Sequence, residues 1–352
     1  MNNLTENQSK VLIAIKDNKN SVAAIIEACE MPKKSATGTL TSLLKANLIR
    51  KNADETYSLI ESEPLSNDEV SDSKTLVNQV EDLSVINPDQ ENPMVLLIPY
   101  IKSGDGGEEL KYALRSWEKN YTGPLKVIIV GEKEEWFSPE ITLIPVEPHL
   151  IKEVCNCPKP SLILNPQADS TNKVFTALVA EDIKGEFILS NDDIFLLGNT
   201  LFADLQTLKA FKDDLDKTAE GDGIYAQNNG LASKALKANN LPVIRYGTHT
   251  PMVLNAEKLI DIIEKYKALE NGYPLVSLYY NEVYPDARPI VVSGEISDNI
   301  LASAYRDNIP TETLKTVFET RKFLNCNAKG LISIKPFLEM YFPNPSIYEY
   351  SN

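Results

Sequence analysis

The sequence has 352 residues, a formal net charge of −15 and a hydrophobic content of 43%. That length is enough for one large domain with a full core plus a smaller one, and the apolar fraction excludes a chain that is disordered throughout. No apolar run approaches the roughly 20 residues that a membrane-spanning helix needs, and no basic segment followed by an apolar core opens the chain, so we expect a soluble, unexported protein.

Charge and cysteine content narrow the class further. Residues 1–60 hold eight Lys and Arg against six Asp and Glu, a balance of +2, which leaves −17 for the rest of the chain. Only the N-terminal part is therefore suited to binding a polyanion. The four cysteines, with Cys155 and Cys157 one residue apart, fit neither a dense disulfide framework nor paired zinc knuckles, so we expect a cytoplasmic location.

Residues 1–61 carry three helical patterns followed by two short strands. Apolar residues keep helical spacing in the ranges 11–15, 22–26 and 40–48, and residues 49–51 and 56–60 form strands around a polar turn. This order resembles the winged helix-turn-helix family, in which the third helix enters the DNA major groove. The resemblance implies that the DNA-binding residues are Lys33, Lys34, Ser35, Thr37 and Thr39. The alternative is a module for protein contacts or dimerisation.

Residues 62–93 change character. Ser, Asn, Asp and Glu dominate this stretch, and Pro64, Pro88 and Pro93 interrupt it. Such a composition predicts an acidic linker between two independent units.

From residue 94 onward, apolar strands alternate with amphipathic helices. The patterns predict strands at 95–101, 125–130, 141–146, 187–189 and 243–245, and helices at 108–120 and 173–183. Alternating strands and helices favour an α/β domain over residues 94–352, with a mainly parallel sheet covered on both faces. Ligands of such a sheet lie beyond the C-terminal ends of its strands.

Two adjacent acids at such a strand end are the most informative feature. Asp192 and Asp193 interrupt an apolar run that otherwise reads as buried strand. A carboxylate pair there is costly to desolvate unless a cation lies beside it, and enzymes that use nucleotide sugars hold Mg²⁺ or Mn²⁺ between such acids and the donor diphosphate. The alternative is that the two acids only cap or form a turn.

Three segments resemble the Stealth proteins, which include bacterial capsular polysaccharide phosphotransferases and the lysosomal-enzyme GlcNAc-1-phosphotransferase. Residues 108–130 with 191–195 look like the family's second conserved region. Residues 248–252, with His249 two residues before proline, are similar to the third. Residues 322–327 and 337–349 look like the fourth.

The chain also departs from that family. The Trp-Val-Asp-Gly-like turn of the first region is replaced by residues 98–107, where Asp105 is the only acid, and Asn325-Cys326 stands where the family has an Asn-Asp pair. Glycosyl transfer is therefore at least as well supported as the family's transfer of a sugar 1-phosphate.

Together these features predict a glycosyltransferase-A-like (GT-A-like) enzyme that uses a divalent metal and a nucleotide sugar, with UDP-sugars foremost. The expected metal ligands are Asp192 and Asp193, and Asp193 and His249 are the expected catalytic residues. The donor is expected to contact Arg115, Asn172, Lys173 and Asp105. For Arg115 the alternative is a surface ion pair, and for Asn172 it is capping of the helix that begins there.

The expected acceptor is DNA with a modified base, or a molecule associated with DNA. Two alternatives remain open. One is a Stealth-type sugar-1-phosphate transferase acting on a glycan. The other is a DNA-binding regulator that senses a nucleotide sugar without turnover.

Overall fold

The computed structural model describes the N-terminal positions 10–11, 14–15, 19, 21–29, 31–33, 36, 39–40, 43, 49–52 and 56–59, and then residues 93–102, 106–153, 159–295 and 298–350. The chain divides into two compact units, Met1–Val85 and Ile86–Asn352. The predicted linker up to residue 92, the turn residue Asp105 and the pair Cys155 and Cys157 lie outside the described residues.

The N-terminal unit contains a helix and a hairpin. Helix α2 spans Val22–Cys29, and strands β1 (Ile49–Lys51) and β2 (Tyr57–Leu59) pair antiparallel, with Ile49 opposite Leu59. Its core contains Val11, Ile15, Ile25, Met31, Ala36, Leu40, Leu43, Ile49 and Tyr57. Lys33 is exposed and Thr39 is half-buried, whereas Lys34, Ser35 and Thr37 lie outside the described residues. The winged-helix assignment stays a prediction.

The C-terminal unit is built on a five-stranded sheet with the order β11-β8-β3-β4-β5. Its strands are β3 (Met94–Tyr100), β4 (Leu125–Gly131), β5 (Ile141–Pro145), β8 (Glu186–Leu189) and β11 (Met252–Asn255). The pairs β8-β3, β3-β4 and β4-β5 are parallel, and β11 alone runs antiparallel. The predicted α/β domain with a mainly parallel sheet is confirmed.

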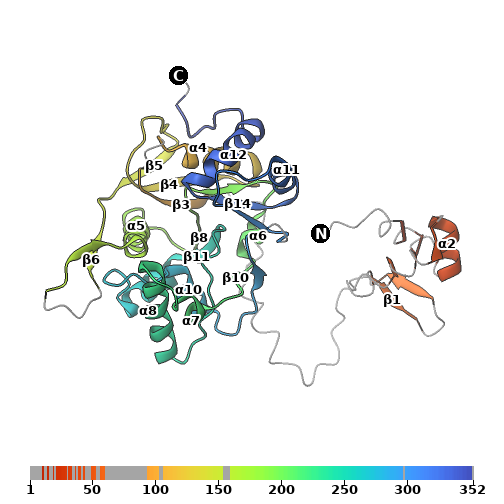
Figure 1. The fold of residues 1–352 in the computed structure, drawn as a ribbon, viewed down its shortest axis with the longest axis horizontal. Coiled ribbons are helices and arrows are strands. Elements are labelled where there is room, and N and C mark those ends of the chain that lie inside the picture. Colours follow the sequence, from red (N-terminus) through yellow and green to blue (C-terminus); the bar gives the residue numbers. More distant parts are fainter. Residues whose placement is uncertain are drawn as a thin grey trace. The chain divides into compact units, whose positions relative to one another are not determined.

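Opposite faces of this sheet pack against two different helices, because successive side chains of a strand point to opposite sides. Leu96 and Val127 belong to a core with Trp117 of α4 (Glu108–Asn120), whereas Leu97 and Ile128 belong to a core with Val174 of α5 (Pro166–Ala180). Figure 1 accordingly shows α4 and α5 on opposite sides of the sheet. Helix α4 has the predicted bounds.

The strand order reverses between β3 and β8. From β3 the chain moves to β4 and then to β5 on one side, and β8 later takes its place on the other side of β3. In open α/β sheets, ligands bind at such a reversal, beyond the C-terminal ends of the strands. Residues 190–193 follow β8 at this point, so the fold places the acidic pair where a ligand is expected.

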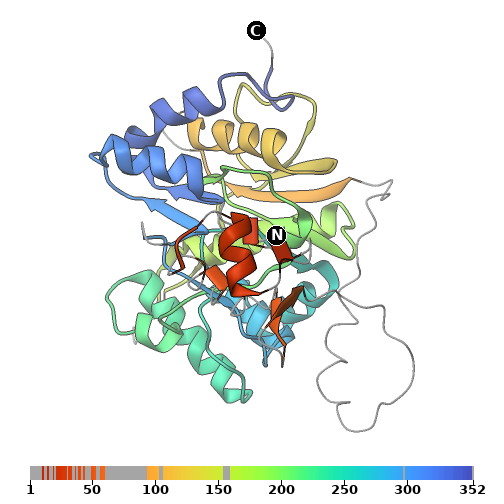
Figure 2. The same ribbon diagram turned by 90° about the vertical axis from the view of Figure 1, so that its right-hand side faces the viewer.

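A second sheet with the order β13-β14-β9 lies next to the first. Its strands are β9 (Ile194–Leu196), β13 (Leu301–Ala304) and β14 (Phe323–Cys326), and helices α11 (Thr311–Thr320) and α12 (Ala328–Tyr341) share a core with it. In Figure 2, α4, α11 and α12 gather at one end of this unit and α7 and α8 at the other.

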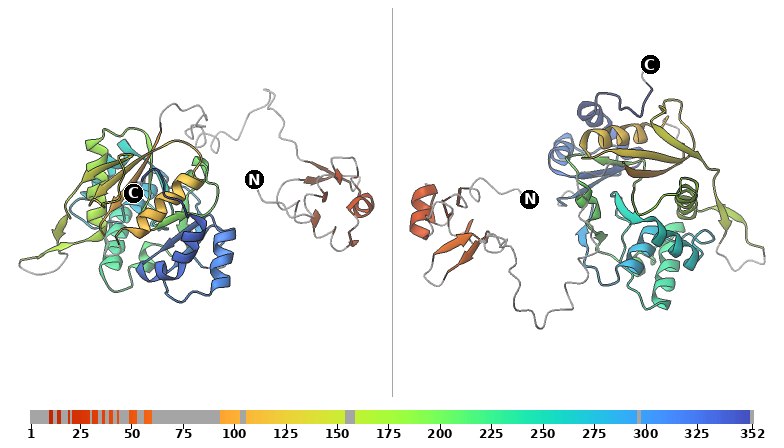
Figure 3. Two further views of the ribbon diagram at one scale, coloured as in Figure 1. Left: turned by 90° about the horizontal axis from the view of Figure 1, so that it is seen from above. Right: turned by 180° about the vertical axis from the view of Figure 1, so that it is seen from behind.

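The remaining elements complete the unit. Helices α6 (Phe202–Gln206), α7 (Leu215–Thr218), α8 (Ile224–Ala238), α9 (Ala256–Tyr266) and α10 (Leu275–Val283) lie between β9 and β13 in the chain. Strands β10 (Lys209–Phe211) and β12 (Ile290–Val292) pair parallel, and β6 (Leu150–Lys152) and β7 (Leu162–Leu164) form a projecting hairpin (Figure 3). Within the described residues, no helix has the length and apolar content to span a membrane.

Two sequence predictions are wrong in this unit. Helix α5 begins at Pro166 rather than at residue 173, because Asn165 caps it by accepting hydrogen bonds from the amides of Gln167 and Ala168. Residues 243–245 are not a strand. Their segment is held by side chains of α10. Asn281 accepts a hydrogen bond from the amide of Ile244 and donates one to its carbonyl, and Ser277 accepts from the amide of Tyr246, two residues further on.

Candidate functional site

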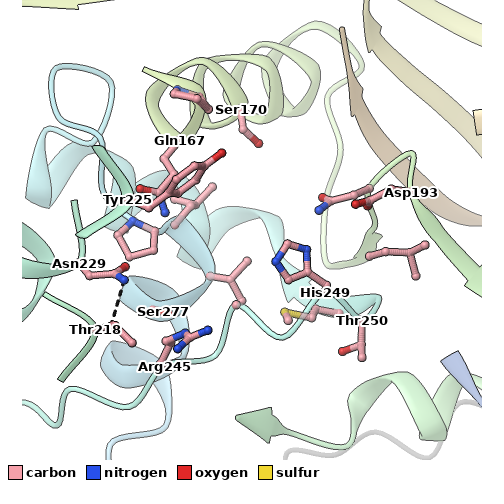
Figure 4. A pocket seen from close by; sticks show the side chains of 18 of the residues that line it. Gln167, Ser170, Asp193, Thr218, Tyr225, Asn229, Arg245, His249, Thr250 and Ser277 are labelled. Carbon is pink, nitrogen blue, oxygen red and sulfur yellow. Dashed lines mark hydrogen bonds between the residues drawn. The ribbon is translucent and has the colours of Figure 1, made fainter. Parts of the chain in front are cut away.

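A cavity of about 800 Å³ lies at the C-terminal end of β8. Its walls include residues 189–191, 193 and 194, several residues between Arg245 and Met252, and residues near the start of three helices. Figure 4 shows Gln167, Tyr225 and Asn229 at one end of the view and Asp193 at the other, with His249 between them. The cavity therefore joins the predicted catalytic residues Asp193 and His249 to residues that the sequence did not single out.

Three helices begin at the wall of this cavity. Lining residues come from the first turns of α5 (Pro166 and Gln167), α8 (Tyr225) and α10 (Leu275 and Val276). Each helix N-terminus carries roughly half a positive charge and amides that point outward. Three of them around one space favour an anionic ligand such as a phosphate group.

Asp193 is the unsatisfied acid of the cavity. Its Oδ1 atom is buried and has no hydrogen-bond partner among the described residues. Burial, together with the negative charges of Asp192 and Glu109, raises the pKa of Asp193 well above its ordinary value. A carboxylate oxygen that is buried without a partner is costly, so this position favours a cation or a proton donor from a ligand.

Cys326 lies beside this acid, at the place where the Stealth resemblance expects an aspartate. Its Sγ donates to Glu109 Oε1 at 3.6 Å, and its backbone amide donates to the carbonyl of Asp193 at 3.3 Å. Burial, followed by the charges of Glu109 and Asp193, raises the pKa of the thiol. The thiol therefore stays protonated, which makes it a hydrogen-bond donor in the acidic cluster rather than a nucleophile.

His249 has a strained backbone and a neutral ring. Its φ of 53° lies in the left-handed region that residues other than glycine rarely adopt, and such strain concentrates at functional sites. Burial and the positive charge of Arg245 lower the pKa of its imidazole. A histidine that is neutral at working pH can accept a proton from a hydroxyl group.

Arg245 is the cation of the cavity. Its guanidinium stacks on the ring of Phe211, with 4.2 Å between Cζ and the ring centroid, and makes no ion pair within the described ranges. A planar guanidinium held by an aromatic ring keeps its N–H groups available for phosphate oxygens. The sequence analysis did not single out Arg245 as a site residue, because the apolar pattern predicted a strand over residues 243–245.

Arg115, predicted to contact the donor, binds the C-terminal segment instead. Its Nε donates to Glu349 Oε1 at 2.7 Å, its Nη2 donates to Oε2 at 2.6 Å, and its Nη1 donates to the carbonyl of Phe342 at 3.2 Å. The two side chains are 13% and 6% exposed. Burial alone would raise the pKa of Glu349, but the hydrogen bonds from Arg115 and Ser346 lower it. The alternative predicted from the sequence was a surface ion pair, whereas this pair is largely buried and its partner is distant in the chain.

We expect Arg115→Ala to destabilise the protein by about 3 kcal/mol, because it leaves a buried carboxylate without its partner. Arg115→Lys should recover only part of this, since an ammonium cannot make the two parallel bonds. Urea unfolding measures the loss. A normal unfolding curve together with a large loss of donor binding would instead support the predicted role at the donor.

Three other predicted donor contacts do not lie at the cavity or cannot be placed. Asn172 and Lys173 lie in the second turn of α5, and Lys173 Nζ is buried in an ion pair with Asp169 Oδ2 at 2.6 Å. Helix α5 begins earlier than expected, so its N-terminal residues at the cavity are Pro166 and Gln167. Asp105 lies outside the described residues.

Only one of the two predicted metal ligands lines the cavity. Asp193 lines the cavity, whereas Asp192 does not, although its charge acts on Asp193. No group of three or more His, Cys, Asp and Glu side chains suited to a metal occurs in the described part of the chain. Mg²⁺ commonly takes only one or two protein carboxylates and completes its shell with substrate phosphates and water, so Asp193 with Asp192 beside it fits an ion that arrives with its substrate.

Comparisons with known proteins identify no family. No protein-family model matches the chain, and no curated protein matches it. Among solved structures, it is similar to an apo structure of the bifunctional glycosyltransferase WbbM, with a TM-score of 0.37 and 9% sequence identity. The match covers 92% of this chain and 62% of that one, so the chain spans less than two thirds of its neighbour.

Proposed function

We propose that the chain is a transferase that uses a nucleotide sugar and a divalent metal. The observation that supports this most is the composition of one cavity, which is lined by Arg245, by the first turns of three helices and by Asp193, whose Oδ1 has no partner among the described residues. A metal-bound diphosphate is complementary to these groups. Its phosphate oxygens can bind Arg245 and the helix N-termini, and its metal can bind the carboxylate.

Each residue has a role in this proposal. Asp193, with Asp192 beside it, holds Mg²⁺ or Mn²⁺, which neutralises charge on the departing phosphate when it is bound. Arg245 binds phosphate oxygens through its fork of N–H groups. His249 accepts the proton of the attacking hydroxyl group, and its lowered pKa keeps it in the base form near neutral pH.

Transfer of a sugar 1-phosphate is the second candidate. Residues of three segments that resemble Stealth regions line the same cavity: Asp193 from the second, His249 from the third and Cys326 from the fourth. This clustering favours a common chemistry for the three segments. The products separate the two candidates, because glycosyl transfer releases a nucleoside diphosphate and phosphotransfer releases a nucleoside monophosphate.

The test is a panel of nucleotide sugars incubated with the full chain and Mn²⁺, with the released nucleotide identified by chromatography. Release of either nucleotide, and its loss on metal chelation, supports the proposal. Binding of a nucleotide sugar without turnover, combined with sequence-specific DNA binding by the full chain, would replace it with the regulator alternative.

Arg245→Ala should weaken binding of a nucleoside diphosphate by about 10- to 100-fold, the worth of a charge-assisted hydrogen bond or two. Arg245→Lys should lie between this variant and the original protein. Isothermal titration with Mg²⁺ measures the change. Arg288→Ala is the matched control, because Arg288 is exposed and does not line the cavity. Equal affinities for the Arg245 and Arg288 variants would remove Arg245 from the site.

The acceptor remains the part of the proposal that depends on the N-terminal unit. We propose DNA, or a molecule associated with DNA, on the strength of the winged-helix resemblance and the +2 charge of residues 1–60. Electrophoretic mobility shifts of DNA fragments by the full chain test it, and a chain that retards no DNA at low salt would contradict it.

A further inference from the structure

The end of the cavity away from Asp193 is formed by an exposed tyrosine. Tyr225 lies in the first turn of α8 and is 58% exposed, although it lines the cavity. Gly223 leads the chain into this turn with a φ of 95°, which a residue with a side chain rarely adopts. The aromatic ring is thus placed at the cavity by the helix start and is left with much of its surface uncovered.

Two uncharged amides, those of Gln167 and Asn229, line the cavity at the same end as this ring. Gln167 Oε1 is buried and has no hydrogen-bond partner among the described residues. Asn229 Nδ2 donates to Thr218 Oγ1 at 3.0 Å, which fixes the orientation of the amide at the cavity wall (Figure 4). A carboxamide offers a donor and an acceptor side by side, and this pair matches the edge of a nucleobase.

The charged side chains differ between the two ends of the cavity. Asp222 lines the cavity three residues before Tyr225, whereas the cation Arg245 acts on His249, nearer to Asp193. The cavity therefore offers an aromatic ring with amides, then a cation, then a carboxylate. A nucleoside diphosphate with its metal has the same order: base, ribose and phosphates, metal.

We propose that this end is a nucleobase subsite, in which Tyr225 stacks on the base and the Gln167 and Asn229 amides bind its edge. The inference rests on the proposed function and adds the direction in which the donor binds. The base lies against α5 and α8, and the diphosphate points to Asp193. Asp222 is then in place to accept hydrogen bonds from ribose hydroxyls.

The experiment compares ligands with and without a base. Affinities of the full chain for UDP, CDP, ADP, GDP and inorganic pyrophosphate are measured by titration calorimetry with Mg²⁺. The same measurements follow for Tyr225→Ala and Tyr225→Phe. For the nucleoside diphosphate that binds best, Tyr225→Ala should lower the affinity by about 5- to 150-fold, which is the range for aromatic stacking on one base. Pyrophosphate affinity should not change, and Tyr225→Phe should keep the affinity of the original protein.

Tyr350→Ala is the matched control, since Tyr350 is 55% exposed and does not line the cavity. A nucleoside diphosphate that binds equally well to Tyr225→Ala overturns the subsite alone, and a rise in the acceptor KM of that variant would then assign this end to the acceptor. If no nucleoside diphosphate binds the original protein, the nucleotide-sugar function fails together with the subsite.

Discussion

Asp193→Asn should lower turnover by roughly 10²–10⁴-fold and, without metal, raise the melting temperature. The loss follows because the amide removes the charge that holds the metal, and metal stabilisation of a departing phosphate contributes several kcal/mol to the rate. The gain follows because the carboxylate is shielded from solvent, has an unpartnered oxygen and lies near the charges of Asp192 and Glu109. Replacing a residue that stabilised the scaffold would instead lower both the turnover and the melting temperature.

The pH dependence of stability gives the same test a second readout. The pKa of Asp193 is raised in the folded protein, so the folded state holds this proton more tightly than the unfolded state. Its cost is absent below roughly pH 4, the ordinary pKa of an aspartate, and grows as pH rises through the folded pKa. Asp193→Asn should remove this decline, which thermal melts across pH measure.

Metal should stabilise the original protein and leave the variant unchanged. Mn²⁺ binds the folded state and should raise the melting temperature of the original protein by mass action, but not that of Asp193→Asn. Asp261→Asn is the control, because Asp261 is exposed on α9 and does not line the cavity. An Asp193→Asn protein with normal turnover would contradict the proposed function.

The parts of the fold that were predicted correctly depend on local apolar patterns. Residues 95–98 and 127–130 are continuous apolar runs, which a parallel strand buried on both faces requires, and the structure places them in β3 and β4. Helix α4 was predicted with the correct bounds because its apolar stripe, Leu110, Leu114 and Trp117, keeps helical spacing between polar ends.

The failures depend on contacts that a local pattern does not contain. The start of α5 is polar, so hydrophobic spacing missed it, although Asn165 followed by Pro166 is a recognisable cap and first helical residue. Residues 243–245 have a strand-like composition, yet side chains of α10 hold this segment. Arg245 consequently lines the cavity, and neither it nor Tyr225 could be assigned to the site before the helices were placed around it.

The resemblance to the Stealth family selected residues of two kinds, which only the structure separates. Asp193 and His249 line one cavity, whereas Arg115 and Glu349, from the segments that resemble the second and fourth regions, bind each other in the scaffold. A charged residue in a segment that resembles a family therefore indicates which segments lie close together. Whether the residue takes part in catalysis or in the scaffold depends on its contacts.

His249→Asn should lower the transferase kcat by about 10²–10⁴-fold, the range for loss of a general base, while nucleoside diphosphate binding remains. Burial and, second, the charge of Arg245 lower the pKa of the imidazole. The base form therefore persists to a pH below the ordinary value, and Arg245→Met should raise the imidazole pKa by removing the nearby charge. The chain has only two histidines, so NMR titration can follow both imidazoles and the His249→Asn spectrum assigns them. An unchanged His249 titration in Arg245→Met would show that the two side chains are not coupled. A normal kcat in His249→Asn would show that another group is the general base.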